Sequence, residues 1–391
     1  MRARIDRLFV LAFAALLAAP LVQMWLRIVP VPAVEERREF RALVDPLPRL
    51  AAMDPKLAGD VNGWFDDHYG FRDLLIRINN EINYQFFRTA DKVFIGKDGW
   101  LFAKEDFNQI VKDAGDAAAA GAIVTSLRNL RDCLARRNVG LVVVLNTSKS
   151  SLYPEFLPPE AARNPPSRLA QRVAAVLDEE TGLIFIDAER VLRKHRHETV
   201  FFKTDMHMNP KGAWFVYGEL IKRLSSALDE LPPPAKPQSW REDYWPYGGE
   251  ARYLSKFLPL GEMVAMSSAS FGAMKDDEFG KFRFDLGKGA VPGRPDIPLF
   301  DWTFENKRDQ TNLLPPIMLF GTSFTDPLFD LRLNEDFKAI YRTKSNIPER
   351  IVRVLQNLPP DVKFLVLEYP EPFVGLIEYL PVGRNCEMPN W

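Results

Sequence analysis

The sequence is short of the residues that build metal sites and disulfide scaffolds. Its 391 residues include two cysteines, Cys133 and Cys386, and four histidines. Two cysteines alone cannot form a structural zinc site, although one disulfide between them is possible. A zinc site made from the histidines around residues 195–207 is an alternative, but these histidines do not have a recognised ligand spacing. We therefore expect neither a metal nor a cofactor.

The chain also lacks an excess of charge of one sign. It has 51 basic and 52 acidic residues, which gives a formal net charge of −1. This balance provides no electrostatic reason to expect nucleic acid as a partner. A glycine-rich loop that would hold a nucleotide is missing as well. The hydrophobic content of 47% is ordinary for a folded protein, and the length suits one large domain or two small ones.

One long hydrophobic run is present, close to the N-terminus. Residues 8–26, LFVLAFAALLAAPLVQMWL, carry no charge and follow Arg2, Arg4 and Arg7. Their number is close to the ~20 residues that cross a bilayer as a helix. A cleaved signal peptide is the alternative, but its apolar region would be shorter. The arginines place the N-terminus inside and the body outside, which in a bacterium means a single-pass inner-membrane protein with its domain in the periplasm. The expected divisions are a signal-anchor at 1–29, a periplasmic tether at 30–50 and one domain at 51–391.

Beyond about residue 90, apolar strands and helical patterns alternate along the chain. Continuous apolar runs such as GLVVVLN (140–146), IMLF (317–320) and FLVL (364–367) are typical of strands in a parallel sheet. We therefore predict an α/β fold with a mainly parallel sheet flanked by helices. The sequence TVFFK (199–203) is interpreted as a further strand. Residues 231–315 have no clean period and are predicted to form an irregular insertion, into which antiparallel pieces would fit.

Three polar residues at strand ends supply the parts of a nucleophilic site. In parallel α/β sheets the chemistry lies at the carboxyl ends of the strands. Asp205 and His207 follow TVFFK, and Ser323 follows IMLF in the sequence GTSF. A serine becomes a nucleophile when a histidine takes its proton, and the histidine needs a carboxylate that fixes its tautomer. We therefore predict Ser323 as nucleophile, His207 as base and Asp205 as the partner of the base.

Neighbouring residues at strand ends are candidates for contacts with the substrate or with an oxyanion. A small residue at position 321 would let the backbone approach a developing oxyanion, to which N–H groups near Ser323 could donate. The candidates for such contacts are Gly321, Thr322, Phe324, Lys149, Asn209 and Glu368.

Each member of the triad also has a plain structural explanation. Asp205 could cap the helix that begins near Pro210, and a single histidine near a helix start is often structural. GTSF could be a simple turn, and it is not the G-x-S-x-G elbow because residue 325 is threonine. His195 and His197 lie at a basic helix end and are interpreted as a solvated terminus. The catalytic interpretation is favoured because the three parts occur together at strand ends.

Four blocks in this order resemble those of the alginate O-acetyltransferase family of the AlgJ and AlgX type. The blocks are VFIGKDGWLF (93–102), VLNTSKSSLYPEFLP (144–158), KTDMHMNPKGAW (203–214) and GTSF (321–324). The resemblance implies a circularly permuted SGNH-hydrolase-like domain in which Ser323 accepts the acyl group. It also implies an O-acetyltransferase that acts on hydroxyls of an exported exopolysaccharide, such as alginate, cellulose or a similar glycan. The implied acetyl donor is a multispanning membrane-bound O-acyltransferase.

The chain departs from the family pattern at two blocks. The usual D-x-H-W block ends here in Met208 instead of tryptophan, and a later E-x-P-E-R-Y block has Pro372 and Phe373 in place of arginine and tyrosine. These losses keep two alternatives open. One is a carbohydrate esterase with the same triad, and the other is a non-catalytic polysaccharide-binding or assembly subunit that retains the fold.

Overall fold

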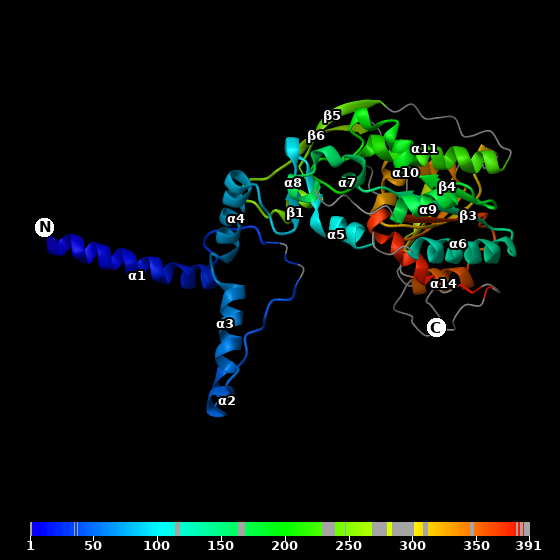
Figure 1. The fold of residues 1–391 in the computed structure, drawn as a ribbon. Coiled ribbons are helices and arrows are strands. Elements are labelled where there is room, and N and C mark those ends of the chain that lie inside the picture. Colours follow the sequence, from blue (N-terminus) through cyan, green and yellow to red (C-terminus); the bar gives the residue numbers. More distant parts are fainter. Residues whose placement is uncertain are drawn as a thin grey trace.

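The structure is a computed structural model that describes most of the chain. The described residues are 2–34, 36, 38–113, 118–162, 169–228, 239–246, 248–267, 280–283, 301–307, 312–344, 348–380, 382–383 and 386. Figure 1 shows two parts, in which the N-terminal helices extend away from a larger α/β domain.

The α/β domain is built on a seven-stranded sheet. In spatial order its strands are β4 (Leu183–Asp187), β3 (Gly140–Asn146), β11 (Phe364–Pro370), β9 (Ile317–Phe320), β10 (Ala339–Thr343), β8 (Trp302–Asn306) and β7 (Gly280–Arg283). Neighbouring strands from β4 to β10 are parallel, whereas β8 is antiparallel to both β10 and β7. The prediction of a mainly parallel sheet is therefore confirmed.

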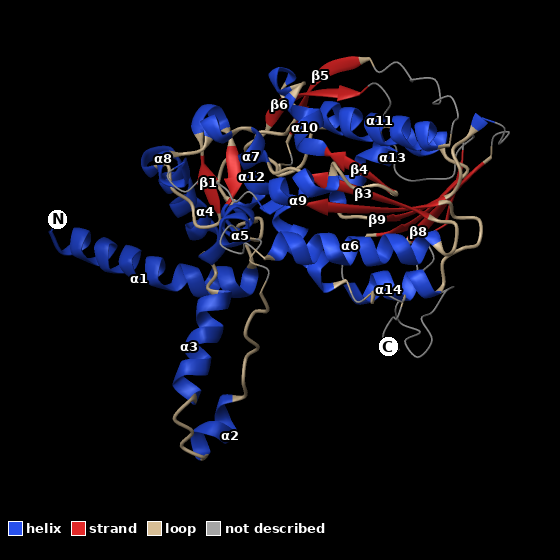
Figure 2. Ribbon diagram, turned by 45° about the vertical axis from the view of Figure 1, so that its right-hand side comes forward, coloured by secondary structure: helices blue, strands red, loops and turns tan. Residues whose placement is uncertain are grey.

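Helices cover both faces of this sheet (Figure 2). The side chains of β3 alternate between two cores, because Val142 and Val144 pack into one and Leu141, Val143 and Leu145 pack into the other. Burial on both sides explains why the strands read as continuous apolar runs. The first core is covered by α10 (Ala188–Arg193), α11 (Pro210–Ala227) and α13 (Pro327–Asp330), and the second by α6 (Ala119–Ala135), α9 (Leu169–Leu177) and α14 (Pro348–Gln356).

A disulfide joins the second layer to the C-terminal end of the chain. Cys133 in α6 is bonded to Cys386, and the two Cα atoms are 5.2 Å apart. The pairing that two cysteines made possible is therefore formed. It links residues that are 253 positions apart in the sequence.

Shorter elements surround the sheet. β1 (Val93–Ile95) and β2 (Leu101–Ala103) form an antiparallel hairpin, and β5 (Trp240–Trp245) pairs antiparallel with β6 (Glu262–Ser267). The remaining helices of the domain are α5 (Lys104–Asp113), α7 (Lys149–Leu152), α8 (Pro159–Ala162) and α12 (Gly249–Tyr253).

The N-terminal part is entirely helical where it is regular. It contains α1 (Arg2–Leu26), α2 (Pro46–Ala51), α3 (Leu57–His68), α4 (Arg72–Ile82) and a π-helical turn at Asn83–Phe87. By length and composition α1 can cross a membrane, since an 18-residue window within Arg4–Leu26 has a mean hydropathy of 2.1. The single N-terminal apolar helix fits the predicted single-pass anchor. The divisions at residues 29, 30 and 50 stay predictions.

Two sequence interpretations change in the structure. TVFFK is not a strand of the sheet, because Phe201 forms only an isolated bridge to Met208 and Thr199 has a left-handed backbone with φ of 53°. The described parts of residues 231–315 are also more regular than expected. They include a two-stranded ribbon, the short helix α12 and the antiparallel edge strands β7 and β8.

Candidate active site

The structure brings Ser323, His207 and Asp205 into one hydrogen-bonded line. Ser323 begins the short 3₁₀ turn Ser323–Thr325 after β9, and the other two lie in the loop before α11. His207 Nε2 lies 2.6 Å from Ser323 Oγ, and His207 Nδ1 lies 2.5 Å from Asp205 Oδ1. The backbone N–H groups of His207 and Gly249 also donate to the Asp205 carboxylate, at 3.0 and 2.6 Å. This is the arrangement in which a carboxylate fixes the tautomer of a base beside a hydroxyl.

The contacts of Asp205 and His207 set the charges of these two side chains. Burial tends to raise the pKa of Asp205, but hydrogen bonds and the charge of His207, with the two backbone N–H groups, lower it to about 2. Burial tends to lower the pKa of His207, but the bond to Asp205 and its charge outweigh this and raise the pKa above 6.5. Asp205 is therefore ionised at neutral pH and stabilises the protonated form of His207.

The loop that carries the pair is held at both ends. The Glu262 carboxylate accepts hydrogen bonds from the N–H groups of Lys203 and Thr204, each at 2.7 Å. At the other end the Asn209 side chain accepts from Gly212 N–H at 3.0 Å and caps α11. Asn209 was a candidate for substrate contact, and the structure places it as this cap with 3% of its surface exposed.

The serine turn is held by a buried carboxylate at the end of β11. Glu368 Oε2 accepts from Thr322 N–H at 2.7 Å and from Thr322 Oγ1 at 3.0 Å, and Glu368 Oε1 accepts from Asn146 Nδ2 at 2.7 Å. A Cβ atom at Gly321 would lie 2.3 Å from Thr325 Cγ2 and 3.2 Å from Glu368 Oε2. The glycine is therefore required for the close packing of the turn against this carboxylate.

One backbone donor near the nucleophile is available for an oxyanion. The N–H of Gly321 donates to Thr343 O at 3.1 Å, that of Thr322 donates to the Glu368 carboxylate, and that of Phe324 donates to Thr322 Oγ1 at 3.3 Å. Within the described part of the chain, the N–H of Ser323 has no acceptor. A developing oxyanion next to Ser323 Oγ could therefore use it.

Phe324 supports the histidine from the side. Its ring centroid lies 4.8 Å from that of His207, and its carbonyl accepts a hydrogen bond from the Tyr217 hydroxyl at 3.0 Å. Tyr217 is fully buried in α11. The aromatic ring thus restricts the movement of the imidazole.

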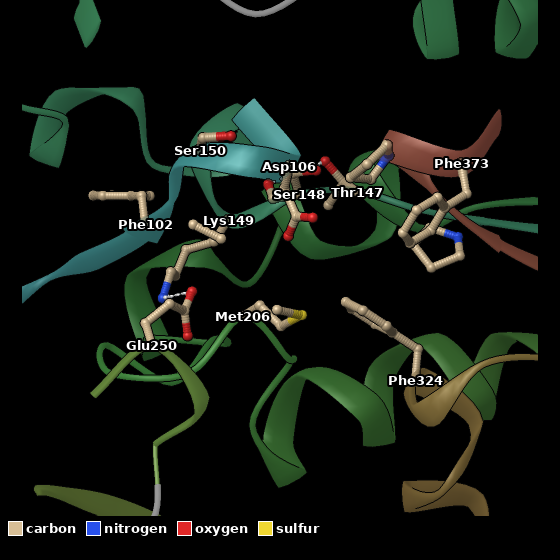
Figure 3. Close-up of a pocket in the computed structure, with 13 residues that line it drawn as sticks. Phe102, Asp106, Thr147, Ser148, Lys149, Ser150, Met206, Glu250, Phe324 and Phe373 are labelled. Carbon is tan, nitrogen blue, oxygen red and sulfur yellow. Dashed lines mark hydrogen bonds and ion pairs between the residues drawn. The ribbon is translucent and has the colours of Figure 1, made fainter. Parts of the chain in front are cut away.

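Lys149 forms a buried ion pair that contacts the loop carrying Asp205 and His207. Its ammonium group is 3.2 Å from Glu250 Oε1 and donates to the carbonyls of Asp205 and Lys203 at 2.8 and 3.1 Å. Figure 3 shows Lys149 and Glu250 pointing toward each other at one side of the pocket that Met206 and Phe324 also line. Burial raises the pKa of Glu250 to about 7, with Lys149 opposing and Asp205 adding to the increase. Lys149, a candidate for substrate contact, therefore supports the loop.

Ser323 and His207 open into a cavity of about 200 Å³. Asp205 also lines it, and the other walls are Phe202, Met208, Pro210, Trp245, Ser267, Asp326, Pro327, Asp330 and Leu331. Aromatic rings beside carboxylates are a surface on which a sugar ring can stack and donate hydrogen bonds. Among the described residues no group of three His, Cys, Asp or Glu side chains could hold a metal ion.

Several residues that build the site were missed in the sequence. Gly249, Glu250 and Glu262 come from the segment that has no clean period, and Arg342 comes from a strand without any motif. Arg342 is fully buried and donates to Thr322 O at 3.0 Å and to Asp326 Oδ1 at 2.6 Å. The dipeptide Gly248-Gly249 was the one available signal, because a Cβ at Gly248 would lie 2.1 Å from Thr204 Oγ1.

Comparisons with known proteins point to one family. Residues 93–267 match the family described as "SGNH hydrolase-like domain, acetyltransferase AlgX". A probable alginate O-acetylase AlgJ of Pseudomonas aeruginosa is 30% identical over 363 residues, which cover 86% of this chain and 83% of the relative. One from Azotobacter vinelandii is 27% identical over 214 residues, which cover 53% of this chain. The chain spans about half the length of the relatives from Azotobacter vinelandii, Pseudomonas syringae and Pseudomonas fluorescens.

A solved structure is also similar. The O-acetyltransferase domain of Pseudomonas putida AlgJ matches with 19% identity and a TM-score of 0.46, over 73% of this chain and 92% of that one. The family match agrees with the predicted SGNH-hydrolase-like fold class. The circular permutation stays a prediction.

Proposed function

Because the chain belongs to the family of alginate O-acetylase AlgJ and its AlgX-type acetyltransferase domain, we propose that it is an O-acyltransferase that moves acetyl groups to sugar hydroxyls. The observation that carries the proposal is the line of hydrogen bonds from Ser323 through His207 to Asp205. We propose an exported exopolysaccharide as the acceptor, because the relatives are named as probable alginate O-acetylases.

The proposed reaction has two acyl-transfer steps. In the first, His207 Nε2 takes the proton of Ser323, whose Oγ attacks the acetyl carbonyl of the donor. The N–H of Ser323 donates to the resulting oxyanion, and His207 returns the proton to the leaving group. In the second, His207 takes the proton of a sugar hydroxyl, whose oxygen attacks the acetyl-serine. The serine then leaves with the proton from His207, and Asp205 stays ionised throughout.

The proposed location is the periplasmic side of the inner membrane. The uncharged part of the candidate membrane span, residues 8–26, follows Arg2, Arg4 and Arg7, which favour an N-terminus on the cytoplasmic side. The periplasm holds no pool of acetyl-CoA, so the acetyl group must be carried across the membrane. We assign that step to a multispanning membrane-bound O-acyltransferase as partner.

The proposal is tested by trapping the acyl-enzyme. The full chain is incubated with p-nitrophenyl acetate, with and without an alginate oligosaccharide, and digested for mass spectrometry. We expect acetylation of the peptide that contains Ser323, which decreases as acetylated oligosaccharide forms. Release of acetate alone would indicate an esterase. Acetylation at other residues, or none, would contradict a role of Ser323 as nucleophile.

The raised pKa of His207 predicts the pH dependence of acylation. Only neutral His207 can take the proton of Ser323, so the rate should fall as the pH drops through a midpoint above about 6.5. Asp205→Asn removes the bond and charge that raise this pKa, so burial should then dominate and the midpoint should move to lower pH. The midpoint of His207 is measured by NMR titration of the imidazole protons in both proteins. Asp132→Asn, an exposed carboxylate change in α6, is the matched control and should leave the midpoint in place. An unchanged midpoint in Asp205→Asn would show that the pair is not coupled.

A further inference from the structure

Exposed apolar side chains are concentrated in the segment between the membrane helix and the α/β domain. We call residues 40–87, which contain α2, α3, α4 and the π-helical turn, the stem. Phe86 is 77% exposed, and Met53 is 89% exposed. The other exposed large apolar residues of the stem are Phe40, Leu43, Leu47, Leu50, Phe65, Leu75, Ile78, Ile82 and Phe87. Such a concentration of uncovered apolar surface indicates a binding partner.

One face of α4 holds the stem to the domain. Arg77 Nη1 donates to Lys256 O at 2.9 Å, and the Glu81 carboxylate lies 3.3 Å from Lys256 Nζ. The same ammonium group lies 3.8 Å from the centre of the Tyr84 ring. Asn80 Nδ2 donates to the carbonyl of the residue before Lys256, at 3.4 Å. Positions 77, 80, 81 and 84 share one side of a helix, so this side is directed to the domain.

The opposite face of α4 is apolar and uncovered. Leu75, Ile78 and Ile82 in α4, with Phe86 in the π-helical turn that follows it, come at intervals of three, four and four residues. They are 52%, 40%, 44% and 77% exposed. Within α4 this spacing places the first three on one stripe, roughly 140° around the helix from positions 77, 80 and 81 at the usual 3.6 residues per turn. The stripe therefore points away from the α/β domain.

The membrane helix leaves the stem on that same side. Figure 1 shows α1 and the α/β domain on opposite sides of the stem, with α1 running across the line of α3 and not along it. The last turns of α1 contact the junction of α3 and α4, since a Cβ at Gly70 would lie 2.2 Å from Pro20 O and 2.5 Å from Met24 N. Trp25, at the end of α1, is 74% exposed. Tryptophan at the end of a span is typical of the level of the lipid headgroups.

We propose that the apolar stripe of the stem lies on the lipid surface from which α1 emerges. If α1 crosses the bilayer, the helices that run across its end lie along the surface of the bilayer. The apolar stripe, directed away from the domain, then meets the boundary between headgroups and acyl chains, where amphipathic helices bind. Because α1 keeps the stem at the membrane, even a weak lipid contact is made at high effective concentration. The α/β domain is thereby held at a fixed side of the surface instead of swinging on a free tether.

The test uses the full chain reconstituted into vesicles of phosphatidylethanolamine and phosphatidylglycerol. Ile78→Cys and Phe86→Cys are labelled separately with a thiol-reactive, polarity-sensitive fluorophore. The native cysteines are bonded to each other and do not compete for the label. Val176→Cys in α9 is the matched control, because Val176 and Ile78 are both 40% exposed apolar residues. All three positions lie at the surface, so the substitutions should leave the fold intact.

Quenching separates the possible occupants of the stripe. We expect nitroxide-labelled lipids to quench the fluorophores at residues 78 and 86 several-fold more than the one at residue 176. A water-soluble quencher should show the reverse order. Equal quenching at all three positions would mean that the stripe stays in water and would overturn the proposal. Protection at residues 78 and 86 from both quenchers would show that protein, either a second copy or another partner, covers the stripe, and would overturn it as well.

Discussion

Ser323→Ala is expected to abolish acetyl transfer while the protein stays folded. The substitution removes one hydroxyl from a turn that is held by Glu368 and Gly321, so the packing of the turn should be kept. The rate of acetyl transfer should fall by several orders of magnitude, because the members of such a triad act as a unit. Removing the nucleophile alone costs about as much rate as removing all three residues. His207→Ala should match it for the same reason.

The measurement is the rate of acetyl transfer to an oligosaccharide, with thermal unfolding as the check on folding. Ser226→Ala is the control, because Ser226 is an exposed serine in α11 whose hydroxyl donates only to its own helix, at Lys222 O. It should retain full activity. Normal acetylation by folded Ser323→Ala would exclude the acyl-serine mechanism. Absence of transfer by the folded wild-type protein as well would favour the interpretation as a non-catalytic subunit.

Lys149→Met is expected to destabilise the protein more than other single changes near the site. The ammonium group and its partner Glu250 are 3% and 1% exposed, so the substitution leaves a buried carboxylate without its cation. It also removes a donor from the carbonyls of Asp205 and Lys203. Breaking a buried pair in this way costs about 3–5 kcal/mol of unfolding free energy. Acetyl transfer should fall too, because the loop that holds Asp205 loses its support.

The pH dependence identifies the cause of this loss. In the folded protein the pKa of Glu250 is about 7, above its ordinary value of 4.5. Ionisation of this buried carboxyl group therefore lowers the free energy of unfolding as the pH rises through this range. Without Lys149 the pKa of Glu250 should rise further. The unfolding free energy lost in Lys149→Met should therefore be larger at pH 8 than at pH 5. Denaturant unfolding at pH 5 and at pH 8 measures this loss of unfolding free energy. Lys222→Met, a 69% exposed lysine in α11, is the control and should change stability little. An equal loss at both pH values would show that the charge of Glu250 is not responsible.

The sheet and the triad were readable from the sequence because each rests on a local pattern. The apolar runs at 140–146 and 364–370 are buried on both faces, and such strands leave an unbroken signature. Ser323 and His207 could be linked because strand ends of a parallel sheet share one edge. The structure places these residues in one hydrogen-bonded line although TVFFK is a loop, since a segment can reach this edge without being a strand. Their catalytic roles stay predictions.

The supporting residues could not be found in this way, because their roles depend on contacts between distant segments. Glu250 contacts Lys149 across 101 positions, and Glu262 reaches Lys203 across 59. Neither carboxylate lies in a periodic segment or a known motif. Lys149 and Asn209 were noticed for their positions, but the sequence does not show whether a side chain faces a substrate or a neighbouring backbone.

The place of β11 in the sheet has a consequence for the order in which the molecule is assembled. β11 is the last strand in the described part of the chain, yet it lies between β3 and β9. Until residues 364–370 are present, β3 and β9 each have an open edge, and Ser323 has no buried Glu368 to hold its turn. A chain that is threaded through a membrane from its N-terminus would therefore keep these strand edges exposed until residues 364–370 had crossed. If the domain is exported as proposed, export machinery and chaperones would meet it with an incomplete sheet, and the disulfide to Cys386 would form only after β11 had crossed.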